Sequence, residues 1–177
     1  MKTSLVLTLI GRDRPGLVSA VAACATAGGA NWLESRLAQL AGQFAGVVRL
    51  EVDEGDADRL EASLRELETE GLHLTIERGA APGLTAGRRM TRLELVGHDR
   101  PGIVRDISMV LARHGVSIEE LETACESAPM SSEQLFRAKA VLEVSSSVSL
   151  EALRHDLEAL ANELMVDLNL DDGDRGR

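Results

Sequence analysis

Hydrophobic residues follow one order along the chain, and that order occurs twice. Leu5, Leu7 and Leu9 alternate with other residues, as expected for a strand with one buried face, and residues 17–27 carry apolar positions at helical spacing. Two further alternating runs, a second leucine-striped helix and a short closing run complete the first half. Residues 90–170 repeat this sequence of elements. The pattern therefore predicts strand–helix–strand–strand–helix–strand in each half.

The strongest sign of duplication is a short motif at the first strand-to-helix turn. It reads GRDRPGLV at residues 11–18 and GHDRPGIV at residues 97–104, an offset of 86 residues. Such self-similarity identifies two copies of one structural unit. At the third strand of each unit the offset has risen to 92 residues. The second unit therefore contains six extra residues, which we place in a loop at 127–133.

The element order βαββαβ constrains the topology of each unit. Right-handed crossovers favour an antiparallel four-stranded sheet with both helices on one face, the ferredoxin-like α+β arrangement. We expect a first unit at residues 1–78, a linker at 79–89, a second unit at 90–170 and a polar tail at 171–177. Units this small bury a limited core, and their sheet edges stay open, so we expect them to pair with one another or across a homodimer.

Composition argues against direct binding of nucleic acid. The formal net charge is −10, and the chain has only two Phe, one Trp and no Tyr. An acidic protein does not attract polyphosphate, and single-stranded nucleic acid is usually held by stacking on exposed aromatic rings. We therefore expect no direct contact with DNA or RNA.

The chain carries no pattern typical of a membrane protein or a secreted one. No stretch approaches the roughly 20 apolar residues that span a bilayer. The first apolar run, at residues 5–10, is too short for a signal peptide and continues as a strand. We expect a cytoplasmic protein whose two cysteines, Cys24 and Cys125, are small buried thiols.

The repeated turn admits two interpretations. In the simpler one, Asp13 caps the helix and the glycines only shape the turn. In the other, free amides of Gly16 and Leu17 at the helix start attract an anion, and Arg14 either adds a cationic fork or points to solvent. A small carboxylate suits such a place. Asn31 opens the second strand and either only forms a turn or offers its amide to the same ligand across an interface between units.

No catalytic residue, metal ligand or cofactor site is predicted. The four histidines are scattered, and neither cysteine has an obvious histidine partner. No Cys/His spacing resembles a set of metal ligands, and the glycines are not followed by the Lys-Ser or Lys-Thr of a phosphate-binding loop. We therefore expect a protein that is not an enzyme.

The motif and its surroundings resemble those of a known domain. A βαββαβ unit with Asp-Arg-Pro-Gly at residues 13–16 and Gly-Ala-Asn at residues 29–31 looks like an ACT domain. Two such units in a chain of this length resemble the glycine cleavage system transcriptional repressor family. The second-unit insertion at residues 128–131, before Phe136, also fits that family.

The resemblance implies an amino-acid-responsive regulator. ACT units pair side by side and hold amino acids at the interface between units, while the repressor family acts on transcription through a DNA-binding activator protein. Glycine as the ligand is suggested by the family alone. Carried over onto this sequence, the ligand positions of the first unit are Asp13, Arg14, Gly16, Leu17 and Asn31, and those of the second are Asp99, Arg100, Gly102, Ile103 and Ser117.

Two other functions remain compatible with the sequence. The chain could be a regulatory subunit that binds and controls an amino-acid biosynthetic enzyme, as some ACT proteins do, or a purely structural interaction module.

The second ligand site differs from the first, because Ser117 replaces Asn31 and His98 replaces Arg12. We therefore do not expect the two sites to be equivalent.

Overall fold

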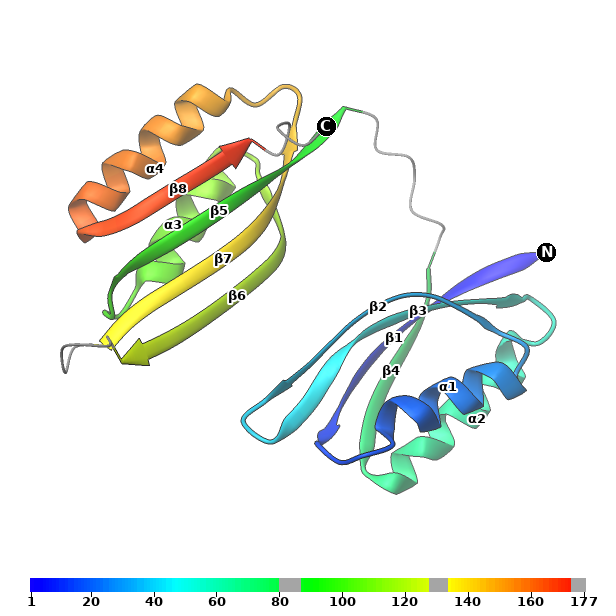
Figure 1. Cartoon of the computed structure of the whole chain (residues 1–177). Coiled ribbons are helices and arrows are strands. Elements are labelled where there is room, and N and C mark those ends of the chain that lie inside the picture. The colour runs from blue at the N-terminus through cyan, green and yellow to red at the C-terminus, as the bar shows by residue number, and fades with distance from the viewer. Residues whose placement is uncertain (80–86, 128–133, 173–177) are drawn as a thin grey trace. The chain divides into compact units, whose positions relative to one another are not determined.

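The chain folds into two units, Met1–Leu84 and Thr85–Arg177 (Figure 1). The computed structural model describes residues 1–79, 87–127 and 134–172. Most of the expected linker, the inserted loop of the second unit beyond residue 127 and the tail beyond residue 172 lie outside the described residues.

The first unit has the predicted order of elements. It consists of β1 (Lys2–Arg12), α1 (Leu17–Ala27), β2 (Asn31–Leu40), β3 (Gln43–Asp53), α2 (Ala57–Glu66), the short 3-10 helix η1 (Leu67–Glu70) and β4 (Leu72–Gly79). The strands form one sheet in the order β2-β3-β1-β4, and all neighbouring strands are antiparallel.

The second unit repeats this arrangement. It consists of β5 (Arg88–His98), α3 (Ile103–Arg113), β6 (Ser117–Ser127), β7 (Gln134–Ser145), α4 (Leu150–Leu164) and β8 (Val166–Asp172). The sheet order is β6-β7-β5-β8, again antiparallel throughout. Two α+β units with four-stranded antiparallel sheets and the order βαββαβ were predicted from the periodicity, and the structure confirms them.

The core of each unit lies between the sheet and its two helices. Leu5, Leu7 and Leu9 of β1 are at most 2% exposed and pack in one cluster with residues of both helices, including Val21 and Leu60. Burying a leucine of this kind contributes roughly 1.5–3 kcal/mol. Alternate residues of the central strands therefore decide which sheet face the helices cover.

Two members of the predicted helix stripes are not in the core. Val18 of α1 and Val104 of α3 occupy the same position in the two copies, and they remain 44% and 41% exposed. Helical spacing places both residues on the apolar side of the helix. It does not show which of the apolar residues the sheet covers and which stay exposed at the margin of the core.

The expectation of two buried thiols is wrong for one cysteine. Cys24 in α1 is partly buried, and Cys125 on the edge strand β6 is exposed. Desolvation, followed by the neighbouring Asp99 carboxylate, raises the pKa of the Cys125 thiol. The exposed thiol is therefore less readily ionised than a free cysteine, which lowers its reactivity as a nucleophile.

A hydrogen bond between α3 and α4 makes the second unit sensitive to acid. His114 at the end of α3 donates through Nε2 to the Asp156 carboxylate at 2.8 Å. This bond, with smaller help from the charges of Arg113 and His155, holds the pKa of Asp156 below its ordinary value. A carboxyl group of this kind stabilises the fold above its unfolded-state pKa, about 4, and the contribution is lost as pH falls through the lower folded-state pKa.

We expect the acid sensitivity of α4 to decrease when this carboxylate is removed. Hydrogen exchange of α4 amides, followed from pH 7 to pH 3 after correction for intrinsic exchange, should show a steeper loss of protection below about pH 4 in the wild type than in Asp156→Asn. Parallel profiles for the two proteins would contradict this assignment.

Among the described residues, no helix is both long enough and apolar enough to cross a membrane.

Candidate functional site

The repeated turn joins the end of β1 to the start of α1. The amide of Asp13 donates to the carbonyl of Gly42 at 3.0 Å, which ties the turn to the β2–β3 hairpin. Gly16 is the N-cap of α1 with a φ of 95°, and no side chain caps the helix. A capping role for Asp13 is therefore wrong. The second unit repeats the geometry, since the amide of Asp99 donates to the carbonyl of Gln134 at 3.0 Å and Gly102 has a φ of 97°.

Two glycines of the motif are explained by the fold alone. The positive φ of Gly16 and Gly102 lies in the left-handed region, which favours glycine. A Cβ on Gly11 would lie 2.8 Å from the carbonyl oxygen of Gly71, and one on Gly97 would lie 2.3 Å from Val166. The first glycine thus allows the closing strand to begin close beside β1. The duplication of these positions is explained without a ligand.

The backbone amides at the start of α1 remain open. The first helical hydrogen bond runs from Ala20 to the carbonyl of Gly16 at 2.8 Å, and no described group accepts from the amides of Gly16 or Leu17. The positive end of the helix dipole lies here and favours an anion. Leu17 as a whole residue is only 4% exposed, whereas Gly16 beside it is exposed, so a ligand would approach the helix start mainly at Gly16. Ile103 in the second unit is likewise buried, at 2%.

The two helix starts differ in charge. The first turn of α1 contains no acidic residue, whereas Asp106 lies in the first turn of α3. Nη2 of Arg105 lies 3.4 Å, and Oδ2 of Asp106 lies 3.6 Å, from the point where a Cβ on Gly102 would stand, and the two side chains pair at 2.8 Å. The second unit therefore has an ion pair of its own beside the helix start. Ala20 occupies the equivalent position in the first unit, two residues beyond the repeated motif.

The side chain of Arg14 is hydrogen-bonded to Glu70, which precedes β4. Its Nη2 donates to the carboxylate of Glu70 at 2.9 Å and to the carbonyl of the same residue at 3.2 Å. Glu70 ends η1 just before the closing strand. The fork predicted for Arg14 is thus already used in part by a protein carboxylate. Its counterpart Arg100 is partly buried.

A single unit does not bring Asn31 to the turn. Asn31 pairs with Glu51 of β3, which in turn pairs with Ser4 near the start of β1. The turn follows Arg12, eight residues further along β1, or roughly 26 Å at about 3.3 Å per residue. Ser117 lies equally far from its own turn, since it pairs with Glu143. A ligand that contacts both the turn and Asn31 therefore needs a second ACT-like unit.

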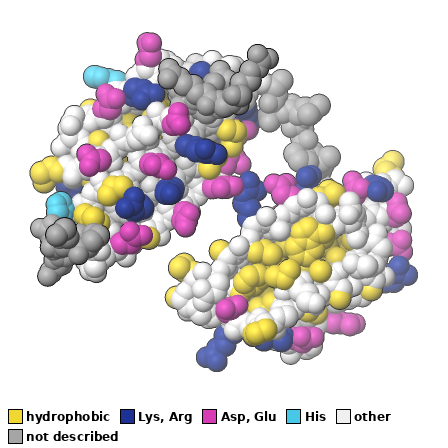
Figure 2. Space-filling model, in the orientation of Figure 1, with side chains coloured by type: hydrophobic (Ala, Val, Ile, Leu, Met, Phe, Trp, Pro, Cys, Tyr) yellow, Lys and Arg dark blue, Asp and Glu magenta, His cyan; other side chains and the backbone are white. Residues whose placement is uncertain are grey.

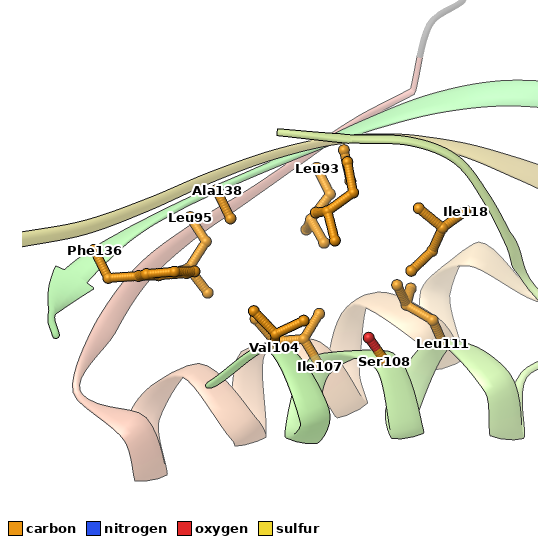
Figure 3. A pocket seen from close by; sticks show the side chains of 11 residues that line it. Leu93, Leu95, Val104, Ile107, Ser108, Leu111, Ile118, Phe136 and Ala138 are labelled. Carbon is orange, nitrogen blue, oxygen red and sulfur yellow. The ribbon is translucent and has the colours of Figure 1, made fainter. Parts of the chain in front are cut away.

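The second unit contains a small apolar cavity between its sheet and α3 (Figure 3). Side chains of the strands point toward the helix in this view, with Phe136 and Ile118 on either side of Leu93. The cavity measures about 20 Å³, which is room for about one water molecule. An apolar space of this size does not admit an amino acid. Trp32 stands at the position of Ile118 in the first unit.

Apolar residues also reach the surface between the first helix and the outer strand of each unit. Val18 and Leu33 are 44% and 40% exposed in the first unit, and Figure 2 shows hydrophobic side chains gathered between α1 and its sheet. In the second unit, Val104, Ile118 and Leu121 are 41%, 37% and 47% exposed. Exposed apolar positions clustered in this way are typical of surfaces that pack against another protein unit.

No group of three or more His, Cys, Asp or Glu residues that could hold a metal ion occurs within the described ranges.

Comparison with known proteins identifies the domain type. An ACT-domain family model matches residues 3–77, and another ACT-domain model matches residues 85–163. A UPF0237 protein of Methanopyrus kandleri is 37% identical over 82 residues, which cover 45% of this chain and 84% of that protein.

Two solved structures are similar to this chain over nearly its whole length. An unknown protein from Galdieria sulphuraria has a TM-score of 0.87 and 27% identity, covering 97% of this chain and 99% of the other. A protein described as a candidate glycine cleavage system transcriptional repressor has a TM-score of 0.71 and 22% identity, covering 97% of each chain. At the latter identity the similarity establishes the fold alone.

Proposed function

Since the chain belongs to the ACT-domain family and carries two such domains in tandem, we propose that it is a non-enzymatic regulator that responds to a small amino acid. ACT domains generally bind small amino acids. The observation that supports this function most directly is the start of α1, where the amides of Gly16 and Leu17 are open and no acidic side chain offsets the helix dipole.

We assign the amino acid to the first unit. Its carboxylate would accept hydrogen bonds from the amides of Gly16 and Leu17, beside Asp13. Asn31 of another ACT unit, in the same chain or in a second copy, would bind the remaining polar groups. The equivalent residues of the second unit, Asp99, Arg100, Gly102, Ile103 and Ser117, would form a weaker site, because the Asp106 carboxylate lies beside Gly102 and already occupies the nearby Arg105 guanidinium.

The regulatory output that we propose is transcriptional and indirect. A net charge of −10 disfavours direct contact with DNA, so a partner protein such as a transcriptional activator would contact the operator. Glycine, and regulation of glycine metabolism, is the choice suggested by the similarity to the candidate glycine cleavage repressor. Affinity capture from cells would test this output: recovery of a transcription factor supports it, whereas recovery of an amino-acid biosynthetic enzyme would make the chain a regulatory subunit instead.

The amino-acid response can be tested by thermal shift and calorimetry with the twenty amino acids. We expect one small amino acid to stabilise the protein, by about 2.7 kcal/mol at 100 times its dissociation constant. Gly16→Ala should abolish that shift, because its Cβ would stand over the open amides. The substitution would also strain the backbone at φ 95°.

Gly29→Ala is the matched control for this strain. Gly29 also has a positive φ, 74°, and no neighbour within 4 Å of its Cβ position, but it lies at the far end of α1. It should lower stability by a similar amount, about 1 kcal/mol, and leave the shift intact. If no amino acid at millimolar concentration shifts the wild type, the proposed function fails.

A further inference from the structure

A depression lined by apolar and polar atoms lies beside the first turn, and its lining does not include Gly16 or Leu17. It is lined by the end of β1, the start of β3 and the segment that leads into β4. Its lining includes the side chains of Ile10, Arg12, Arg14, Gln43, Glu70 and His73.

The strand register explains why these side chains converge. Arg12 pairs with Gln43 on β3, and Ile10 pairs with His73 on β4, so all four point to the sheet face that the helices leave open. Paired residues of neighbouring antiparallel strands share a face and lie about 5 Å apart. Side chains from β1, β3 and β4 therefore meet on the open face, at one end of the sheet.

The depression contains a cation, Arg12, that has no partner among the described residues. Within the described residues, the guanidinium of Arg12 forms no hydrogen bond or ion pair, in a chain that carries ten more acidic than basic side chains. Arg14 is held in place by Glu70 through Nη2 alone, which leaves its Nε and Nη1 donors unused by described residues. His73 is likewise unpaired among the described residues. These groups offer several donors and a net positive charge.

The second unit shows that the fold does not require these residues. At the positions of Arg12, Gln43 and His73 it carries His98, Leu135 and Asp167. At the positions of Glu70 and Gly71 it carries Leu164 and Met165. Arg14 is kept as Arg100, but the second unit forms the same fold with His98 in place of Arg12 and Asp167 in place of His73. Sheet geometry alone leaves the cationic set of the first unit unexplained.

We propose that this depression binds the oxyanion of a small metabolite, through Arg12, Arg14 and His73. Guanidinium groups match the geometry of phosphate and carboxylate oxygens, and such charge-assisted hydrogen bonds are the stronger class. Ile10 supplies an apolar wall for the body of the molecule. Gly16 and Leu17 do not line the depression, so the site would take a second effector in addition to the amino acid.

Calorimetry on the full-length protein tests the proposal with three probes: inorganic phosphate, glycerol 3-phosphate and succinate, each at constant ionic strength. We expect at least one to bind. Preference for the first two identifies a phosphate group, and preference for succinate identifies a pair of carboxylates. Arg12→Gln should weaken binding about tenfold or more, and His73→Asp, which installs the residue of the second unit, should abolish it.

Arg59→Gln provides the matched control, because Arg59 is an exposed arginine on α2 of the same unit and pairs with Asp56, the N-cap residue of that helix. It should leave the affinity unchanged. Equal losses in Arg59→Gln and Arg12→Gln would show diffuse charge attraction and overturn the proposal, as would the absence of binding by all three probes. The response to amino acids should persist in Arg12→Gln, which separates this outcome from failure of the proposed function.

Discussion

Ala20→Asp should abolish amino-acid binding at the first turn while leaving the protein folded. The substitution places in α1 the carboxylate that α3 already has as Asp106. At about 5 Å and an effective dielectric constant of about 20, two like charges repel by about 3 kcal/mol, which corresponds to roughly a hundredfold loss of affinity. An acidic residue in the first turn also stabilises a helix, so reduced stability would not explain the loss.

Ala20→Asn separates charge from size in this experiment. The amide has the shape of the carboxylate without its charge and should keep most of the affinity. Asp106→Asn is the reciprocal change, and we expect it to uncover a second binding event at the start of α3. Calorimetric titration with the amino acid found in the screen measures all three variants. If Ala20→Asp binds like the wild type, the carboxylate does not sit at the start of α1.

Much of the fold could be predicted because it depends on local patterns and on their repetition. Alternation at Leu5, Leu7 and Leu9 sets the buried face of β1, and the duplicated turn identifies two copies before any strand is paired. Exposure on the helices was harder to predict. Val18 has the spacing of a core residue, yet it is 44% exposed, and a second protein unit could supply the missing neighbours.

The site was less predictable because it depends on where chain segments end in space. Asn31 follows α1 by only a few residues, which invites the expectation that it lies near the turn. However, α1 has 11 residues and carries the chain about 16 Å back along the sheet, so Asn31 begins β2 at the opposite end. Glu70 was missed for the converse reason, since it is distant in sequence but lies beside Arg14 in the fold.

The asymmetry between the copies is the main functional lesson of the structure. Both units keep the backbone turn, because Gly16 and Gly102 satisfy the same left-handed geometry. What differs is the charge around the turn: Ala20 against Asp106 at the helix start, and Arg12 against His98 at the end of the first strand. A duplicated scaffold whose copies differ in this way would suit the proposed regulator, with a ligand bound by one unit and another role for the other.

Gly46→Ala should strongly destabilise the first unit. Gly46 lies on β3, where a Cβ would stand 2.0 Å from the carbonyl oxygen of Arg36 and 2.8 Å from the Cα of Leu37. These are backbone atoms of the edge strand β2, so the contact is relieved only if β2 moves or part of its pairing is lost. Overpacking against backbone costs about 3 kcal/mol, and occasionally more, which would lower the unfolding midpoint of a unit of this size by roughly 12–24 °C.

Gly55→Ala is the control for this substitution, because Gly55 has no neighbour within 4 Å of its Cβ position. It should change the midpoint little. The second unit has Ala138 at the equivalent position, opposite Thr123, so the close approach is particular to the pairing of Gly46 with Leu37. Calorimetry, with hydrogen exchange to assign each transition, should show the first unit of Gly46→Ala unfolding early and the second unchanged. Similar midpoints for Gly46→Ala and Gly55→Ala would mean that β2 moves away at little cost, and that the edge strand bearing Asn31 is not held rigidly in place.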